Sequence, residues 1–168
     1  MPDLSQTHSD HTSLDRASPD RDVIGRRQAA MAVLAEGTTA EIARLLAGIG
    51  PLPMHQEIRK AETGLVMVRG RIGGDGAAFN FGEATVSRSA VQLATGEIGL
   101  GYVLGRDHAK AQLIAYCDAL MQRDECRDVV ERVVVAPIKT RVDAVREVRA
   151  EQAAATKVEF FTLVRGEG

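Results

Sequence analysis

The stretch Glu62–Asp107 decides the fold, and it reads ETGLVMVRGRIGGDGAAFNFGEATVSRSAVQLATGEIGLGYVLGRD. Ten of the sixteen glycines lie in it, between short apolar runs and the arginines Arg69, Arg71, Arg88 and Arg106. Glycine loses more backbone freedom on ordering than any other residue, so it weakens the interior of a helix or strand. A segment this rich in glycine is therefore either built of tight hairpins or brings its backbone close to another group.

Apolar alternation and turn residues predict consecutive antiparallel strands through this region. The expected order is a strand at Met54–Arg59, a strand at Leu65–Arg71, a hairpin turn at Gly73–Gly76, a strand at 78–94 that bends near Gly82, a turn at Thr95–Gly96 and a strand at Glu97–Leu104.

Two of these strands carry unusual side-chain patterns. Leu65–Arg71 is apolar on both faces, which predicts a central strand covered on each side. In Glu97–Leu104 the large side chains share one face, whereas Gly99 and Gly101 leave the other face bare. We interpret the bare face as a surface for another protein chain.

Helical periodicity precedes the strands. A helix is expected at about Asp20–Glu36, and Gly37 suits its C-terminal end. Thr38 and Glu41 form a capping-box pattern that predicts the start of a second helix.

Helical periodicity resumes after the strands, with Asp107 as a suitable N-cap. A further helix is expected at 126–135, stopped by Pro137, and another at 138–155. In the last of these helices the residues expected to face the core are Ile138, Val142, Val145 and Val148. Val158–Val164 is expected to be a final strand that returns to the sheet beside one of the early strands.

The predicted fold class is α+β, an antiparallel β-meander with an N-terminal helix pair, C-terminal helices and a final returning strand. We expect one domain over residues 20–168, a length that can bury its own core. Residues 1–19 are rich in Ser, Asp, His and Thr and nearly lack large apolar groups, which predicts a disordered tail.

Composition excludes several classes of function. The net charge of -2 argues against a nucleic-acid binder, which usually has a basic excess. No apolar run approaches the ~20 residues that span a bilayer, and the N-terminus lacks the pattern of a secretory signal. We therefore expect a cytoplasmic protein that uses no membrane and no nucleic acid.

Several dispersed motifs resemble one known family, the G subunit of the bacterial carbon–phosphorus lyase core complex, PhnG. Their order and spacing cover the chain from about Arg27 to Gly166, and several ordered motifs are more specific than one short pattern. The matching runs are Glu62–Val66, Arg71–Gly76, Phe81–Thr85, Tyr102–Asp107, Asp118–Gln122, Ala136–Pro137 and Phe160–Gly166.

The resemblance implies an accessory subunit in phosphonate catabolism whose partners are the other core subunits. That complex couples a phosphonate such as methylphosphonate to the ribose C1 of ATP, displaces adenine, and yields α-D-ribose 1-methylphosphonate 5-triphosphate. The resemblance assigns the metal site and the iron–sulfur cluster to other subunits. ATP is then a substrate of the complex, and this chain alone is expected to bind no cofactor.

The residues themselves offer candidates for anion binding or subunit contact. The Gly73, Gly74 and Gly76 turn can form a phosphate-binding nest, although a plain hairpin is favoured because a strand follows it. The arginines Arg69, Arg71, Arg88 and Arg106 suit bidentate anion contacts or, equally, ion pairs with Glu62, Glu83 or Glu97. Asp107 and His108 stand in the first turn of a helix, and Thr85 belongs to the matching runs.

No self-contained catalytic site is expected. Glu83 is the most plausible acidic group, but a salt bridge to Arg88 or to a partner chain is the favoured interpretation. The histidines and the two cysteines lack the spacing of metal ligands on one element. The alternative to an accessory subunit is a free-standing domain that binds a small anion, or regulates, through Arg71, Arg88 and Arg106.

Overall fold

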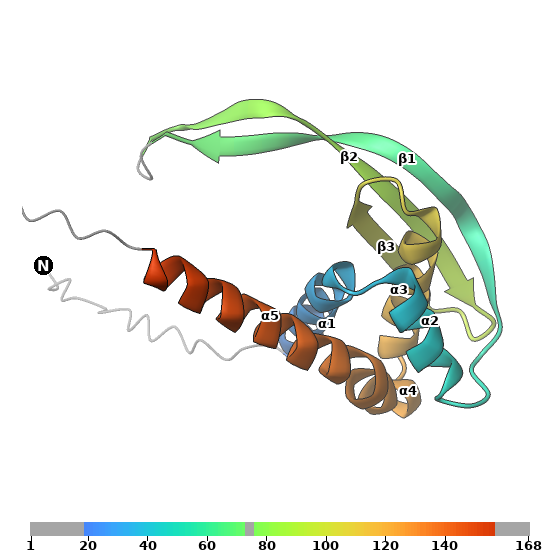
Figure 1. Ribbon diagram of the computed structural model, residues 1–168. Helices are drawn as coiled ribbons and strands as arrows, with labels where there is room; N and C mark the ends of the chain where they lie inside the picture. The colour runs from blue at the N-terminus through green and yellow to red at the C-terminus, as the bar shows by residue number, and fades with distance from the viewer. Residues whose placement is uncertain (1–18, 73–75, 157–168) are drawn as a thin grey trace, which may run out of the picture.

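The computed structural model describes residues 19–72 and 76–156, and the expected tail at 1–19, apart from Pro19, and the expected strand Val158–Val164 lie outside that range. Two helices, three strands and a set of further helices follow one another along the chain (Figure 1). The elements are α1 (Pro19–Glu36), α2 (Thr39–Ala47), β1 (His55–Arg71), β2 (Ala78–Leu93), β3 (Ile98–Leu104), α3 (His108–Met121), α4 (Asp124–Val130), the π-helical turn η1 (Glu131–Val135) and α5 (Ala136–Ala155).

The strands form an antiparallel meander of order β1-β2-β3, which confirms the predicted α+β class. Gly96 adopts φ +108° at the turn before β3, as the Thr95–Gly96 turn requires. The strands differ greatly in length, since β3 ends at Leu104 opposite Val86. Beyond that point β1 and β2 continue alone as a two-stranded arm, Leu65–Arg71 paired with Ala78–Thr85, which curves away from the body (Figure 1).

Two predictions for the first strands are wrong. Met54–Arg59 and Leu65–Arg71 are not separate strands, because β1 runs unbroken from His55 to Arg71 with register shifts near Arg59. Nor is Leu65–Arg71 covered on each side, because the Leu65 side chain is 61% exposed and, among the described residues, β1 lies at the edge of the sheet. The predicted bend near Gly82 corresponds to a register shift opposite Val68.

Helix α3 packs against the bare side of β3 at unusually short range. A Cβ atom added to Gly101 would lie 1.8 Å from the Ala111 carbonyl oxygen, and one added to Gly99 would lie 2.0 Å from the Ala115 carbonyl oxygen. The glycine-bare face is therefore filled by the chain's own helix, and its interpretation as a surface for another chain is wrong. Alanines on α3 allow the helix backbone to approach that closely.

The core lies on this side of the sheet, between the strands and the helices. Leu34, Ile42, Ile114, Leu120 and Ile138 are all fully buried, and they come from four different helices.

Side-chain caps fix both predicted helix starts. Thr38 and Glu41 form the complete capping box of α2. Asp107 caps α3 by accepting a hydrogen bond from the Lys110 amide at 2.9 Å.

The expected helix break at Pro137 does not occur. Pro137 stands in the first turn of α5, directly after η1, where its missing N–H is tolerated. A π-helical turn shifts the hydrogen-bond pattern so that the chain continues into α5 without an interruption. Only Ile138 and Val142 of the expected core stripe are buried, because α5 then leaves the body with Val145 and Val148 exposed (Figure 1).

A buried carboxylate joins α1, α3 and β3. Asp118, only 4% exposed, accepts two hydrogen bonds from the Arg27 guanidinium at 2.9 Å and one from the Leu100 amide at 2.9 Å. This Asp belongs to one of the matching runs, and its contacts give it a structural role. Breaking such a buried pair by removing one partner typically destabilises a fold by about 3–5 kcal/mol.

We predict that Gly101→Ala destabilises the fold by about 1–3 kcal/mol, the usual effect of overpacking a tight contact. The added Cβ would overlap the α3 backbone, so the helix must move off the sheet. The urea midpoint measures this change if the m-value is constant. Gly82→Ala is the matched control, since it lies in the arm with no atom within 4 Å of the added carbon. Equal midpoints for the two variants would contradict the close contact.

Candidate interaction surface

The face of β3 that points away from α3 carries only aliphatic and aromatic side chains and is open to solvent. Strand alternation sends four of the five large side chains of β3 to this face, because glycine holds two of the three opposite positions and the buried Val103 holds the third. The four side chains are 45–77% exposed, and they are Ile98, Leu100, Tyr102 and Leu104. An antiparallel sheet usually turns polar groups toward water, so this pattern is inverted.

The apolar surface continues along the arm. Phe79 pairs with Gly70, and its ring lies 3.8 Å from where a Gly70 Cβ would stand. Phe81 packs edge-on against Phe79, with 6.4 Å between the ring centroids. Val68 lies on the same face, two residues before Gly70. We call this surface the outer face and define it by Ile98, Leu100, Tyr102, Leu104, Val68, Phe79 and Phe81.

Soluble monomers rarely expose large apolar patches, and such patches usually mark a binding surface. The alternation of Gly99 and Gly101 with large apolar residues predicts this face, but the surface for another chain was expected on the glycine side.

One ion pair interrupts the outer face where the arm joins the body. The Arg88 Nε donates to Glu62 Oε1 at 2.8 Å, and this hydrogen bond raises the pKa of Arg88. The guanidinium lies over Gly64, 3.6 Å from the position of an added Cβ. One expected partner of Arg88, Glu62, is thus observed, whereas Glu83 lies opposite Met67, farther along the arm.

The opposite face of the same junction holds a second polar group. His108 Nε2 is 2.8 Å from Thr63 Oγ1, which ties α3 to β1. Asp107 accepts from Thr39 Oγ1 at 2.6 Å as well as from the Lys110 amide, and these bonds lower the pKa of Asp107. Thr39 belongs to α2, so the cluster joins two helices to the sheet.

The remaining candidates divide between the junction and the free end of the arm. Thr85 lies at the junction, where its carbonyl accepts from the Gly105 amide at 2.8 Å. Arg106 is exposed just before α3. Arg69 and Arg71 are exposed toward the free end, where the Gly76 amide donates to the Ile72 carbonyl at 3.2 Å. Gly73 and Gly74 lie outside the described residues.

The four candidate arginines therefore do not lie close together within a single chain. Arg71 lies nine residues beyond Glu62, the partner of Arg88. At ~3.3 Å per residue that is about 30 Å along the strand. Arg88 also lies on the opposite face of the sheet from His108. The geometry does not favour a shared anion site made by Arg71, Arg88 and Arg106 within a single chain.

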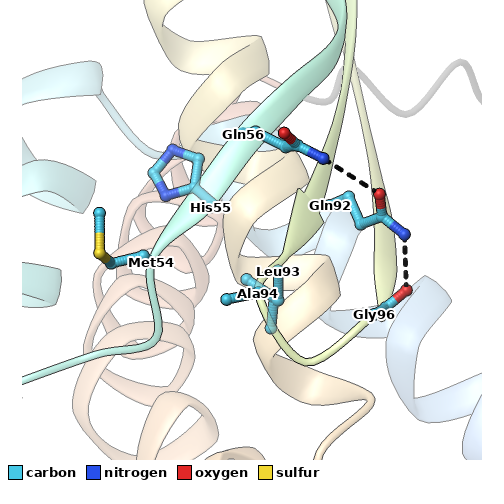
Figure 2. A pocket seen from close by; sticks show the side chains of 7 residues that line it. All are labelled: Met54, His55, Gln56, Gln92, Leu93, Ala94 and Gly96. Atoms are coloured by element: carbon cyan, nitrogen blue, oxygen red, sulfur yellow. Dashed lines mark hydrogen bonds between the residues drawn. The ribbon is translucent and has the colours of Figure 1, made fainter.

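A depression of about 460 Å³ lies at the other end of the sheet (Figure 2). Its lining holds no charged carboxylate, Lys or Arg, and Figure 2 shows Gln56 bonded to Gln92, which in turn donates to the Gly96 carbonyl. His55 packs on Tyr116 with 4.2 Å between ring centroids. The cavity offers no guanidinium or ammonium to a phosphate or phosphonate.

The described residues also hold no group of three metal-ligating side chains. Burial raises the pKa of the Cys117 thiol to about 12, so this cysteine is no nucleophile at neutral pH. Over 19–72 and 76–156, none of the helices has the length and apolarity to cross a membrane.

Comparison with known proteins gives two results. Residues 25–166 match the family described as phosphonate metabolism protein PhnG. The chain is also 47% identical over 152 residues to a protein of Rhizobium meliloti (strain 1021), the alpha-D-ribose 1-methylphosphonate 5-triphosphate synthase subunit PhnG, covering 90% of this chain and 96% of the relative.

We predict that Asp107→Asn lowers stability at neutral pH by about 0.3–1 kcal/mol, the usual contribution of a negative charge at a helix N-terminus, because Asn keeps the capping oxygen and loses only the charge. The folded pKa of Asp107 is depressed, so its charged form stabilises the fold above its ordinary value of 3.8. That contribution is lost as the pH falls through the depressed value, and the gap between variant and wild type should close in acid. Urea midpoints between pH 7 and pH 3 measure it.

Asp128→Asn is the control for this series, because that carboxylate is 82% exposed and its distance to Arg26 is 3.8 Å. It should change stability little at any pH. A gap for Asp107→Asn that persists unchanged into acid would contradict the assigned role of the charged carboxylate.

Proposed function

Because the chain belongs to the PhnG family of phosphonate metabolism proteins, we propose that it is an accessory subunit of a carbon–phosphorus lyase core complex. The complex transfers a phosphonate such as methylphosphonate to the ribose C1 of ATP. A phosphonate oxygen forms the new bond to C1, the bond from C1 to adenine breaks, and the product is α-D-ribose 1-methylphosphonate 5-triphosphate. We place this activity in the cytoplasm.

The outer face is the observation that carries the role of this chain. Its relative is named as a subunit of a synthase, and a subunit needs a surface that other chains cover. Obligate interfaces commonly bury more than ~2,000 Å² and resemble a core cut in half. The exposed Leu100, Tyr102 and Leu104 supply that kind of surface, and aromatic residues such as Phe79 and Phe81 are enriched in interface centres.

The positions of the cationic side chains support an accessory role for this chain in the transferase reaction. A transferase for ATP and a phosphonate needs cationic groups that converge on both anions. Here Arg88 is paired with Glu62, His108 is bonded to Thr63, and Arg69 and Arg71 lie at the far end of the arm. We propose that the companion subunits hold ATP and phosphonate, and that this chain alone binds no cofactor and is inactive.

The arm gives the two distal arginines a specific use. Arg69 and Arg71 lie on the face opposite Phe79 and Phe81, two residues apart on an exposed strand. Inserted between companion subunits, they would meet an acidic surface or an anionic ligand that this chain does not itself enclose. Guanidinium suits both. A free-standing anion-binding domain is less well supported, because its three proposed arginines lie apart.

We predict that the double variant Leu100→Glu, Leu104→Glu loses capture of the companion subunits by at least about a hundredfold, or ~2.7 kcal/mol. Two carboxylates placed in a dry interface would be desolvated without partners. Both positions are already exposed, so the free chain should keep its unfolding midpoint. The measurement is co-purification with companion subunits, followed by growth on methylphosphonate as sole phosphorus source.

Val148→Glu is the matched control, because Val148 is 52% exposed on α5, away from the outer face. It should leave capture and growth unchanged. If it impairs both as strongly as the double variant, or if the double variant retains full capture, the outer face is not the subunit interface.

We further predict that the purified chain, given ATP and methylphosphonate, releases no adenine. The described residues place no nucleophile, base and cation set in one site. Adenine release by the chain alone, abolished by a single substitution such as His108→Ala or Glu83→Ala, would overturn the accessory role. Adding the companion subunits should restore turnover.

A further inference from the structure

A second depression, of about 340 Å³, lies between α1 and β3. Helix α1 supplies one wall from residues at positions i, i+3, i+4 and i+7, which share one face of a helix. The opposite wall comes from β3 and α3. We call this depression the socket and define it by its lining residues, Ile24, Arg27, Gln28, Met31, Leu100 and Asp118.

One buried carboxylate holds the walls of the socket together. The Arg27 guanidinium donates two hydrogen bonds to Asp118, each at 2.9 Å, and the same carboxylate accepts a hydrogen bond from the Leu100 amide at 2.9 Å. Residues of α1, α3 and β3 are therefore fixed relative to one another. Binding to a preformed pocket costs less ordering entropy than binding to a mobile surface, so the socket suits a side chain that anchors a partner.

The lining of the socket favours an apolar occupant. Arg27 and Asp118 neutralise each other, and the described residues of the lining include no further Lys or Arg that could hold a phosphate or phosphonate. The aliphatic part of the lining is incompletely covered, since Ile24 is 50% exposed and Leu100 is 60% exposed. Burial of another large apolar side chain there would remove this surface from water.

The socket adjoins the outer face, because Leu100 belongs to both. The outer face is too small to be a stable interface by itself, since such interfaces usually take about 20–30 residues from each partner. A chain that covers the outer face must therefore reach beyond it. On the α1 side of β3, the socket is the depression into which such a chain can extend.

We propose that the socket is an anchor site for the companion subunit that covers the outer face, and that it receives one large aliphatic or aromatic side chain of that subunit. Side chains of this kind, seated in well-packed pockets from which water is excluded, contribute most of the binding energy of many interfaces. The inference rests on the proposed function, because it requires an interface on the outer face. It adds α1 to that interface.

Thiol labelling of the assembled complex tests whether the socket is occupied. Gln28→Cys places a thiol in the socket, and Ala29→Cys places one at an exposed position of α1 outside it. Both variants carry Cys126→Ser, because Cys126 is partly exposed whereas Cys117 is buried. A maleimide should label both thiols in the free chain. In the complex the Gln28→Cys thiol should react at least about tenfold more slowly, because water and reagent are excluded there, and the Ala29→Cys thiol should keep its rate.

A substitution in the wall tests how much the socket contributes to binding. Ile24→Glu should weaken capture of the companion subunits by at least about tenfold, because the incoming apolar side chain would desolvate the new carboxylate. Ile24→Leu keeps the wall apolar and should retain capture. Ala29→Glu is the matched control and should bind like the wild type. Both positions are exposed, so the unfolding midpoints of the free variants should not change.

Equal labelling of Gln28→Cys in the complex and in the free chain, or full capture by Ile24→Glu, would contradict the inference. Protection that appears in the free chain and grows with its concentration would assign the socket to a second copy. Protection by ATP or methylphosphonate alone would assign it to a small ligand, and either result also overturns the inference.

One comparison separates this inference from the proposed function. Loss of capture by the double variant Leu100→Glu, Leu104→Glu together with full capture by Ile24→Glu would keep the outer face as the subunit interface and remove only the socket from it. Full capture by both variants would remove both.

Discussion

The contact between the α3 backbone and the two glycines of β3 is the constraint on which the rest of the structure depends. Helix and strand come so close that Gly99 and Gly101 have no room for a Cβ atom. The core can close over this side of the sheet only because those positions are empty and because α3 carries alanines at the contact. Protein interiors are close-packed, so a contact this short fixes the separation and orientation of both elements.

The same contact determines what the opposite side of the sheet can do. Since Gly99 and Gly101 occupy two of the three inner positions of β3, its apolar side chains other than Val103 lie on the outer face. The buried Asp118 then anchors the edge of β3 to α1 and α3, so that this face is presented by a firmly held strand. The arm carries the apolar surface beyond the body, where Phe79 and Phe81 extend it. The close packing of α3 on β3 and the exposed apolar outer face thus both follow from the placement of glycines in β3.

Local signals were readable from the sequence and long-range ones were not. The capping box at Thr38 and the N-cap at Asp107 depend on neighbouring residues, and the turn at Gly96 depends on one positive φ, so each could be predicted. The apolar pattern of Leu65–Arg71 predicted a strand buried on both faces. A sequence pattern does not distinguish burial by the same chain from burial by a partner chain, so the exposure of this strand could not be predicted. The π-helical turn that lets Pro137 begin α5 leaves no pattern in the residues.

The candidate site shows the same division. Arg88 and Glu62 pair across adjacent strands, and Glu62 was one of the three carboxylates predicted as partners of the arginines. The separation of Arg71 from Arg88 follows from an arm whose length could not be known before the two early strands proved to be one. The outer face was visible in the alternation of β3 but was assigned to the wrong side, because bare glycines suggest an open surface when the helix that fills them is not in view.

Side-chain footprinting of the free and assembled protein tests the central claim most directly. Hydroxyl-radical labelling would be compared at Tyr102, Phe79 and Phe81 on the outer face and at Met54, an exposed side chain next to the depression at the other end of the sheet. The account predicts strong labelling of all four in the free chain. Binding of the companion subunits should then protect the three aromatic residues selectively. Unchanged labelling of Tyr102 and both phenylalanines in the assembled complex would contradict it.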